Sequence, residues 1–311
     1  MKTPLGLIVI YNPMPDFFAY LDLFYLQLPK ILIVDNGTNS NMHHLLEQEV
    51  QRRGTSLKVI FNSTNLGVAT ALNQGFIWAL EQGYNQIVTF DQDSYPAPRM
   101  LQTMLEAFST YAGGSKLAAV APVVIDVAVN VQARYLRSRN KLLFERVSCN
   151  GSVLEDVTYV ITSGTLYDLT AYQKIGPFRD DFFIDYVDTE YCLRAREKGY
   201  KIIVACQAQL NHRQGERQKR VFLGRDYYPS FHSPLRWYFI SRNRIPMLRR
   251  YALRFPHWTS YELFASFYIF LKMLLFETQK MAKLRALLYG TVDGIRGQMG
   301  KVTDIVLKMV E

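Results

Sequence analysis

The sequence predicts an α/β fold built on a mostly parallel sheet, followed by a helical region near the C-terminus. Two observations support this. Short β-rich runs alternate with helix-like runs over residues 5–91, and long basic and aromatic runs take over after residue 230. With 311 residues and 49% hydrophobic side chains, the chain can bury a large core. We expect a main domain over 1–230, divided into halves 1–115 and 116–230, and a helical appendage over 231–311.

The alternating runs of the first half predict strands joined by crossover helices. The expected strands are 5–11, 30–35, 56–61 and 85–91, and the expected helices are 16–27, 41–53 and 67–82. Each strand is followed by polar or turn residues. Because ligands of open α/β sheets bind beyond the carboxyl ends of the strands, these four turns are expected to line one crevice.

The second half has a mixed pattern rather than a regular alternation. We expect strands at 117–125, 157–164 and 200–205, hairpins or a mobile loop over 130–150, and helices at 168–174 and 187–198. Cys149, Cys192 and Cys206 are odd in number and lack metal-ligand spacing, so we expect reduced, packed thiols. The first residues lack the features of a signal peptide, which favours a cytoplasmic location.

Charge is distributed unevenly along the chain. Residues 1–200 hold 17 Lys and Arg against 20 Asp and Glu, whereas residues 201–311 hold 19 against 7. The basic run 236–254 precedes an apolar run of 16 residues, 261–276. This run is shorter than the roughly 20 residues that span a bilayer, so we interpret it as an interfacial, membrane-surface region. The alternative is an ordinary helical pair packed on the main domain or in a homodimer interface.

Two aspartates follow the expected strand at 85–91 in a pattern that suits a metal ion. Asp91 and Asp93 alternate with Gln92, so both side chains point the same way, and hard cations prefer carboxylate ligands. Two turn-forming aspartates capping a strand would give the same pattern. His212, expected in a polar loop, would join Asp93 as a ligand of Mg²⁺ or Mn²⁺; a solvated loop histidine is the alternative.

Two further polar groups indicate a nucleotide pocket. Asp35 and Asn36 end the second expected strand and can bind a base or a ribose, although an Asx turn accounts for them equally well. Asn65 and Gly67 precede a helix whose N-terminal N–H groups favour an anion. Neither the dinucleotide-binding glycine motif nor a P-loop is present in the sequence.

Three acids at the start of the helix expected at 187–198 supply candidates for a general base. Direct displacement at a sugar carbon needs one carboxylate to accept the proton of the attacking hydroxyl. Asp188 is our first choice and Asp185 the second, whereas acids in a first helical turn, Glu190 included, are often only caps and dipole partners.

Together these segments resemble glycosyltransferase family 2, and within it the bacterial rhamnosyltransferase branch that builds O-antigen and other surface polysaccharides. The matching segments, over residues 5–215, are IVIYNP, IVDNGT, NLGVATALNQG, TFDQDS, ITSGTL, FIDYVDTEYCLRAREKGY and LNHRQG. One departure is that many relatives have Glu-Asp where this chain has Val187-Asp188, with Glu190 at the place of a later Asp.

The resemblance implies a GT-A fold and a role for each motif residue. It implies that Tyr11, Asp35 and Asn36 contact the nucleotide and that Asn65 and Gly67 shape its pocket. It implies further that Asp91 and Asp93 form the metal and diphosphate motif, that His212 helps to bind the metal, and that Asp188 is the catalytic base. Ser163 and Gly164 would lie beside the donor sugar and the acceptor, and we expect Asp185 to contact the substrate as well.

The expected activity is inverting, metal-dependent glycosyl transfer. The resemblance points to dTDP-β-L-rhamnose as donor and to a lipid-linked oligosaccharide at the inner leaflet as acceptor; other hexosyl and galactofuranosyl transferases share closely similar motifs. A nucleotidyltransferase would show a glycine-rich basic loop after the first strand, where this chain has YNPMPD. A non-catalytic basic module that binds nucleic acid or a membrane is the alternative of another class, and we expect no nucleic-acid partner.

Overall fold

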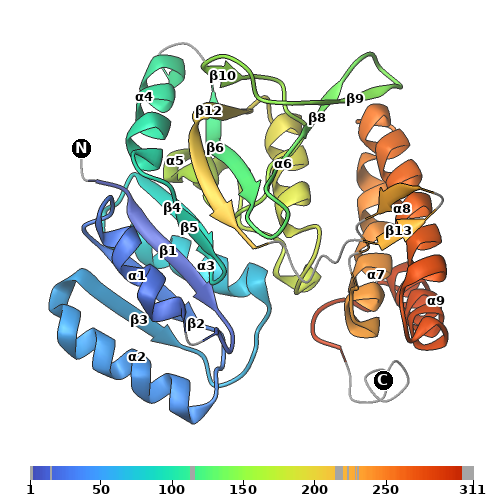
Figure 1. Ribbon diagram of the computed structural model, residues 1–311. Coiled ribbons are helices and arrows are strands. Elements are labelled where there is room, and N and C mark those ends of the chain that lie inside the picture. The colour runs from blue at the N-terminus through green and yellow to red at the C-terminus, as the bar shows by residue number, and fades with distance from the viewer. Residues whose placement is uncertain are drawn as a thin grey trace.

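The computed structural model describes residues 3–302, except 15, 113–115, 214–219, 223, 228 and 230. One ten-stranded sheet forms the centre of the described chain, and helices cover both of its faces (Figure 1). Along the sheet the strand order is β10 (Val153–Leu154), β12 (Lys201–His212), β6 (Leu117–Asp126), β11 (Leu166–Asp168), β4 (Gln86–Asp91), β1 (Leu5–Ile10), β2 (Ile31–Asp35) and β3 (Leu57–Phe61). Two short strands, β5 (Ser94–Pro96) and β7 (Val131–Gln132), pair with β12 and β6.

The first half is the expected parallel unit, with β3, β2, β1 and β4 running side by side in one direction. Its strands are mainly apolar because helices cover both faces. On β1, Leu5 and Leu7 pack in one hydrophobic cluster, and Ile8 and Ile10 pack in the other. The first cluster includes residues of α3 (Val68–Glu81), α5 (Leu169–Ile175) and α6 (Val187–Glu197), and the second those of α1 (Phe17–Tyr25), α2 (Ser40–Arg53) and α4 (Met100–Ala112).

The second half corrects two of the sequence predictions. Residues 157–164, expected to be a strand, form a turn-rich segment with one isolated bridge at Val157, and the strand that pairs with β4 and β6 begins at Leu166. The strand expected to end at 205 runs on to His212 through a bulge between Ala205 and Gln209. His212 therefore ends a paired strand instead of lying in a loop.

The segment 130–150 forms a hairpin, as one of the two expected forms. It consists of β8 (Tyr135–Ser138) and β9 (Phe144–Val147), which pair antiparallel with each other outside the main sheet. A second small hairpin, β13 (Arg220–Phe222) and β14 (Arg225–Tyr227), follows β12. Two 3₁₀ turns, Gly54–Ser56 and Asp180–Phe182, complete the described elements before the C-terminal helices.

Three helices form the C-terminal region: α7 (Pro234–Tyr251), α8 (Pro256–Phe276) and α9 (Lys280–Arg296). The main core continues into this region, since Tyr251 and Trp258 belong to the cluster under α3 and α6. α9 packs closely on α7 because a Cβ at Gly290 would lie 2.2 Å from Ser241 Oγ. The helical appendage is thus packed on the main domain, as the alternative prediction had it.

Helix α8 is longer than expected. It has 21 residues in place of the predicted 16, and it is the one helix among the described residues that is long and apolar enough to cross a membrane, with a mean hydropathy of 1.2 over its apolar window. Only 6% of that window is buried in the protein. The length argument against a spanning helix is therefore wrong, and the packing of α8 has to be considered instead.

The cysteine prediction is wrong for two of the three thiols. Cys149 and Cys206 form a disulfide across a sequence separation of 57 residues, with Cα atoms 5.2 Å apart. The pairing follows from the fold, because β10 lies antiparallel to β12 and aligns Val153 with Ala205. Cys192 is free and buried, as predicted for a packed thiol.

Candidate active site

A cleft of about 690 Å³ opens at the carboxyl ends of β1, β2 and β4. Of the predicted site residues, it brings together Tyr11, Asn36, Asn65, Gly67, Asp91, Asp93, Asp185, Asp188 and His212. Parallel strands end at the same edge of a sheet, and the crossovers return each chain segment to that edge. The expectation of a single crevice at the strand ends is confirmed, because Tyr11, Asn36, Asn65 and Gln92 follow the four strands β1, β2, β3 and β4 in turn.

Asp91, Asp93 and His212 form one cluster at the end of the sheet. Asp91 ends β4, Asp93 lies in the turn before β5, and the antiparallel pairing of β5 with β12 sets His212 opposite Ser94. His212 Nε2 is 3.3 Å from Asp93 Oδ1 and 3.9 Å from Asp91 Oδ2. One potential ligand atom from each residue lies within 4.8 Å of the other two.

The cluster fits a divalent metal ion. Two carboxylates and an imidazole nitrogen form a donor set that Mn²⁺ accepts, and Mg²⁺ prefers the carboxylates. The buried Nδ1 of His212 has no hydrogen-bond partner among the described residues. Burial alone would lower the pKa of His212, but the neighbouring carboxylates of Asp93 and Asp91 raise it above its ordinary value. The two aspartates thus favour positive charge at this position, which a divalent cation supplies.

An asparagine network shapes the floor of the cleft. Asn65 Oδ1 accepts from Asn36 Nδ2 at 3.0 Å and from the Gly67 amide at 2.9 Å. Asn36 Oδ1 in turn accepts from the Leu66 amide at 3.0 Å. At Gly67, where φ is +87°, an added Cβ would lie 2.7 Å from the Phe183 carbonyl oxygen. Glycine is required here because the segment that leads to Asp188 passes directly over it.

Three predicted residues support the cleft without lining it. Asp35 is buried, and its two carboxylate oxygens accept from the Thr38 amide and hydroxyl at 3.0 and 2.9 Å, which is the turn expected as the alternative. Ser163 Oγ accepts from the Asp91 amide at 3.0 Å and so stabilises the turn that follows β4. An added Cβ at Gly164 would meet Leu210 and Pro122 at 2.8 Å.

Asp188 lies in the first turn of α6 and faces the same cleft. Its Oδ1 accepts from the Thr189 amide at 2.7 Å and from the Thr189 hydroxyl at 3.3 Å. Removal of water from around the carboxyl raises the pKa of Asp188 to about 6, and the negative charge of Asp185 adds to that rise. A carboxyl with this pKa is ionised at neutral pH and still basic enough to accept a proton.

The backbone before Asp188 is held in an unusual conformation. Phe183, Asp185 and Tyr186 all have positive φ, at 65°, 63° and 63°. Each costs a residue with a side chain about 1–3 kcal/mol, so the surroundings must hold the segment in place. In the described chain, α7 does so: the buried Asn243 Nδ2 donates to the carbonyls of Phe182, Ile184 and Asp185 at 2.9, 2.8 and 3.1 Å.

A second contact reaches the same segment from α8. Tyr186, the residue before α6, donates its hydroxyl to Glu262 Oε1 of α8. Arg244 Nε of α7 donates to the same carboxylate oxygen at 3.0 Å. The edge of the cleft that carries Asp188 is therefore built partly from the C-terminal helices.

Several cleft residues were not predicted from the sequence. Arg236, in the first turn of α7, donates to Asp185 Oδ1 from Nη2 at 3.1 Å and from Nε at 3.3 Å. Burial raises the pKa of Asp185 while Arg236 opposes that rise. Gln92, between the two predicted metal ligands, accepts from the Tyr11 amide at 2.8 Å. For Arg236 the sequence signal was only a basic run, whereas Gln92 could have been found from its place in the Asp-Gln-Asp turn.

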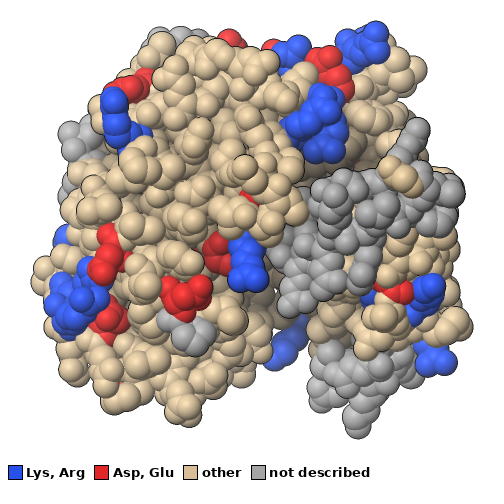
Figure 2. Space-filling view, in the orientation of Figure 1, with Lys and Arg blue, Asp and Glu red and all other residues tan. Residues whose placement is uncertain are grey.

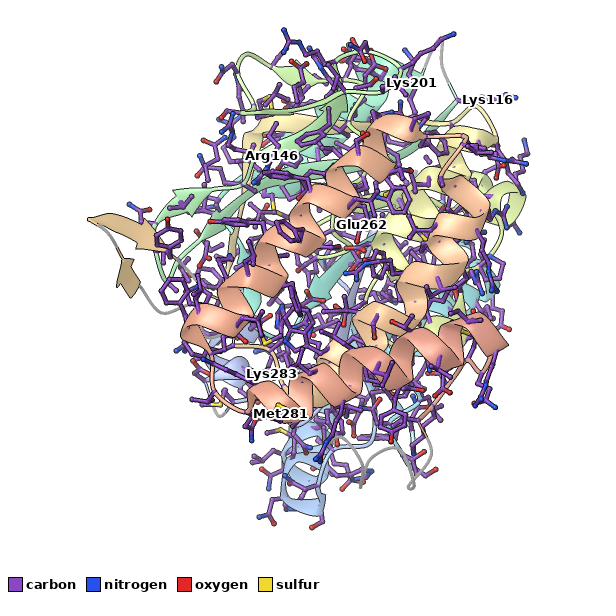
Figure 3. The ribbon with its side chains drawn as sticks, turned by 90° about the vertical axis from the view of Figure 1, so that its right-hand side faces the viewer. Lys116, Arg146, Lys201, Glu262, Met281 and Lys283 are labelled. Carbon is purple, nitrogen blue, oxygen red and sulfur yellow. A yellow bond between two sulfur atoms is a disulfide. The ribbon has the colours of Figure 1, made fainter. Side chains whose placement is uncertain are left out.

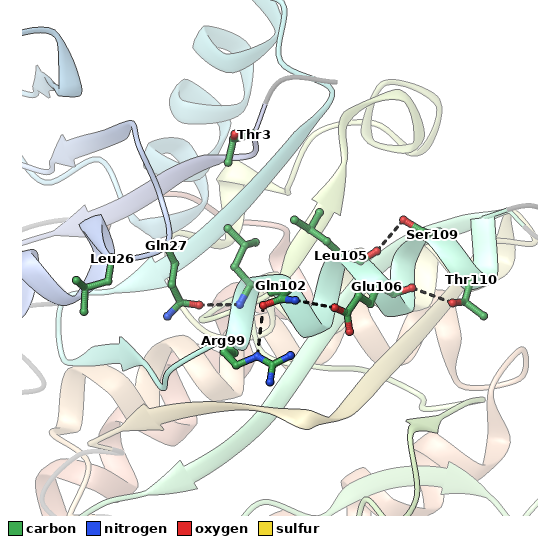
Figure 4. Close-up of a pocket in the computed structure, with 10 residues that line it drawn as sticks. Thr3, Leu26, Gln27, Arg99, Gln102, Leu105, Glu106, Ser109 and Thr110 are labelled. Carbon is green, nitrogen blue, oxygen red and sulfur yellow. Dashed lines mark hydrogen bonds between the residues drawn. The ribbon is translucent and has the colours of Figure 1, made fainter.

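A second cleft of about 700 Å³ lies beside α4, away from the strand ends (Figure 4). Its polar side chains bond mainly to one another and to nearby backbone. Gln102 Nε2 donates to Glu106 Oε1 at 2.9 Å, and Gln27 Oε1 accepts from the Leu101 amide. Glu106 is the one carboxylate among the described lining residues, so no set of metal ligands converges there. The clustered acids and His212 lie instead in the cleft at the strand ends.

Comparisons with known proteins agree with this geometry. The sequence model of the family described as "Glycosyl transferase family 2" matches residues 20–176. A curated dTDP-rhamnosyl transferase RfbF of Shigella flexneri is 26% identical over 303 residues, covering 95% of this chain and 96% of the relative. A polyprenol monophosphomannose synthase of Mycolicibacterium smegmatis is 30% identical over 77 residues, which is 25% of this chain and 29% of that protein.

Solved structures share the fold at low sequence identity. S. aureus TarS 1-349 superposes with a TM-score of 0.59 at 12% identity, over 95% of this chain and 82% of that one. GalNAc-T7, solved with UDP, GalNAc and Mn²⁺, gives 0.56 at 12% identity over 68% of this chain, and the match spans 43% of its length. From the family match over half of the sequence and this fold, the chain belongs to glycosyl transferase family 2 and is a glycosyltransferase of the GT-A fold.

Proposed function

We propose that this glycosyltransferase is an inverting, metal-dependent rhamnosyltransferase of surface-polysaccharide synthesis. It would transfer L-rhamnose from dTDP-β-L-rhamnose to a lipid-linked oligosaccharide. The observation that carries the mechanism is that Asp188, with its raised pKa, shares one cleft with the cluster of Asp91, Asp93 and His212. The choice of rhamnose rests on the RfbF relative, which aligns along nearly the whole chain.

The donor would lie along the floor of the cleft. Tyr11, Asn36 and Asn65 line its nucleotide end, and the exposed ring of Tyr11 suits stacking against a base. Asp91, Asp93 and His212 would hold a Mg²⁺ or Mn²⁺ ion, which neutralises the diphosphate when bound. Asp185 is then placed to accept a hydrogen bond from a sugar hydroxyl, because its Oδ2 has no protein partner among the described residues.

The chemical step is a single displacement. Asp188 Oδ1 is already engaged by Thr189, so Oδ2 accepts the proton of the acceptor hydroxyl. The acceptor oxygen forms the new bond to the anomeric carbon as the bond from that carbon to the diphosphate oxygen breaks. The nucleoside diphosphate leaves with the electron pair. Attack opposite the leaving group inverts the anomeric configuration.

We place the enzyme in the cytoplasm, at the inner face of the membrane, where a lipid-linked acceptor would be reached. The support is the surplus of 19 basic over 7 acidic residues in 201–311. The apolar outer side of α8 gives further support.

The test is release of free nucleoside diphosphate from a panel of donors, dTDP-rhamnose included, with Mg²⁺ or Mn²⁺ and a membrane-lipid acceptor extract. Acceptor-dependent release of dTDP from dTDP-rhamnose is the expected result. Release from another donor alone would keep the mechanism and overturn the sugar, in favour of another hexosyl or galactofuranosyl transfer. No release from any donor would overturn the proposed activity.

The metal assignment has its own readout. Binding of Mn²⁺ is measured by calorimetry for the wild type and for Asp93→Asn and His212→Gln. We expect each substitution to weaken binding at least about tenfold, because each removes a charged or nitrogen ligand. Glu106→Gln, in the second cleft, is the control with the same loss of a carboxylate. Unchanged Mn²⁺ affinity in both site variants would contradict the assignment.

A further inference from the structure

The outward side of α8 is an exposed apolar stripe. Six large apolar side chains recur at helical spacing, with exposed fractions from 39% to 63%: Leu263, Phe264, Phe267, Tyr268, Leu271 and Leu275. Residues three to four positions apart share one face of a helix, so these side chains form one continuous strip. Contiguous apolar surface of this kind on a globular protein marks an interaction site.

The β8–β9 hairpin extends this stripe. Its turn carries Leu142 and Leu143, which are 64% and 52% exposed. The next residue, Phe144, packs its ring against Tyr261 and Phe264 of α8, with ring centroids 5.3 and 6.2 Å apart. The hairpin tip therefore lies beside the helix. We call the six α8 residues together with Leu142 and Leu143 the docking face.

The exposed charges nearest to the docking face are mainly positive, since Glu145 of the hairpin pairs with Arg137. Lys141 adjoins the two hairpin leucines, Lys280 is exposed just beyond the end of α8, and Lys272 Nζ lies 4.8 Å from the centre of the exposed Tyr268 ring. The acids of the same helical segment, Glu262 and Glu277, are buried and paired with basic side chains. The rim of the docking face is therefore positive.

The surface over α2 distributes its charge differently. Over α2, blue and red residues lie side by side on the face shown in Figure 2. There Arg52 and Arg53 pair with Glu49 and Asp22. A positive rim around an apolar strip is the arrangement that an anionic lipid surface complements.

We propose that the docking face lies on an anionic phospholipid bilayer, with α8 parallel to the membrane plane. Figure 3 looks onto α8, with Glu262 labelled beside the helix and Arg146 on the hairpin. This proposal rests on the proposed function only in that a lipid-linked acceptor would be met at that surface. The residues that touch the lipid are those of the docking face, and two of them, Leu142 and Leu143, belong to a hairpin outside the C-terminal region.

The inner side of α8 argues against a spanning helix. Trp258 and Met273 are fully buried, and Glu262 bonds to Tyr186 and Arg244. Insertion across a bilayer would separate Glu262 from Arg244 or expose the ion pair to lipid, and either change is energetically costly. Contact of the outward apolar residues with the membrane surface leaves the ion pair intact. The same bonds join the docked helix to the segment that leads to Asp188, so docking fixes the orientation of the cleft to the membrane.

A second copy of the chain fits the docking face less well than lipid does. In a symmetric pair the same surface meets itself, so the rim lysines of one copy would face those of the other. Like charges brought together in this way are destabilising, whereas lipid phosphates neutralise them.

The experiment is sedimentation of the full-length protein with vesicles of phosphatidylcholine alone or mixed in equal parts with phosphatidylglycerol. We expect binding to the mixed vesicles that weakens as salt is added. Phe267→Ser combined with Leu271→Ser should weaken it at least about tenfold. Lys141→Gln and Lys280→Gln should each weaken it roughly fivefold on the mixed vesicles only. Leu26→Ser, at a leucine that is 79% exposed on the first half, is the matched control.

Each outcome decides the proposal. Equal vesicle binding by the wild type and the Phe267/Leu271 variant, or no binding by the wild type, would overturn it. Self-association of the wild type that the same variant abolishes, measured by analytical ultracentrifugation without lipid, would assign the face to a second copy instead. Vesicle binding without release of nucleoside diphosphate from any donor would overturn the proposed activity and leave the docking face intact.

Discussion

The floor of the cleft and the wall that carries Asp188 are built in different ways. The floor that would receive the donor is made by turns that follow β2, β3 and β4, and its bonds join neighbouring crossovers, such as Asn36 to Asn65. The wall is the segment that leads to Asp188, and we call it the catalytic wall because it carries the proposed base. Three of its residues have positive φ values. Asn243 and Glu262, about 60 to 76 positions further along the chain, hold it in place. The floor is therefore a property of the α/β sheet, whereas the catalytic wall also depends on the C-terminal helices.

The sharpest test of the catalytic wall is removal of the proposed base. Asp188→Asn keeps the shape of the side chain but takes away the proton acceptor, so kcat should fall by about 10³-fold. The donor KM should change little, because the floor is untouched. Turnover is measured as acceptor-dependent release of nucleoside diphosphate.

The control for this variant is Asp180→Asn, which makes the same chemical change at an exposed acid outside the cleft. We expect it to keep wild-type turnover. If Asp188→Asn retained more than about a tenth of the wild-type kcat, a role as general base would be ruled out and Asp185, the second candidate, would be tested next.

A pair of asparagine variants compares the floor and the catalytic wall directly. Asn243→Ala removes three bonds to the carbonyls of the catalytic segment and should lower kcat about tenfold with little change in donor KM. Asn36→Ala loosens the floor and should raise donor KM by a similar factor with a smaller effect on kcat. Steady-state kinetics of both variants are measured with the donor varied at saturating acceptor.

The comparison depends on Asn243→Ala changing mainly kcat and Asn36→Ala changing mainly the donor KM. Each variant also loses buried hydrogen bonds, so urea unfolding shows that both are folded at the assay temperature before the kinetics are compared. If both substitutions changed the same kinetic parameter, the floor and the catalytic wall would act as one unit and not as two separately built parts.

The same division explains what the sequence could predict. Strand ends and their polar turns follow from local patterns, so the parallel unit and the pair Asp91 and Asp93 were predicted from sequence. His212 was also expected to join Asp93, and the structure adds that it does so from the end of a strand. The wrong predictions concern long-range pairing. The extension of β12 to His212 depends on its pairing with β6 and β5, and the disulfide depends on β10 lying beside β12.

The contribution of α7 was hidden for a related reason. A run of six arginines between residues 236 and 254 reads as a basic surface, yet Arg242 is 1% exposed and donates to the Phe182 carbonyl. Nothing local distinguishes an arginine that binds backbone carbonyls of a distant loop from one that faces solvent. Patterns of periodicity reveal which face of a helix is apolar, but not which polar side chains are enclosed by another segment.

A smaller effect of Asp188→Asn should appear in the free energy of unfolding. The substitution that lowers activity should make the folded protein more stable. The pKa of Asp188 rises from 3.8 to about 6 on folding, so the folded protein holds the ionised form less well than the unfolded chain does. The penalty is present above about pH 6 and disappears as the pH falls toward 4. Asp188→Asn should therefore raise the free energy of unfolding by about 1–2 kcal/mol at neutral pH, after allowance for partial exposure.

Urea unfolding at two pH values measures this effect. The gain of Asp188→Asn over the wild type should be present near pH 7 and largely absent near pH 4, whereas Asp180→Asn should show no such gain. A variant less stable than the wild type at neutral pH would mean that the bonds from Thr189 outweigh the loss of water around the carboxyl.

The finest expected effect is a shift of the acidic limb of the pH profile. Because Asp188 acts ionised, kcat/KM of the wild type should fall with a slope of one as the pH drops through about 6. The charge of Asp185 contributes to that raised pKa, so Asp185→Asn should move the limb to lower pH by less than about one unit. Asp180→Asn, too remote to act, should leave it in place. An unmoved limb in Asp185→Asn would show that loss of water alone sets the basicity of Asp188, and that Asp185 serves the catalytic wall through its bond to Arg236.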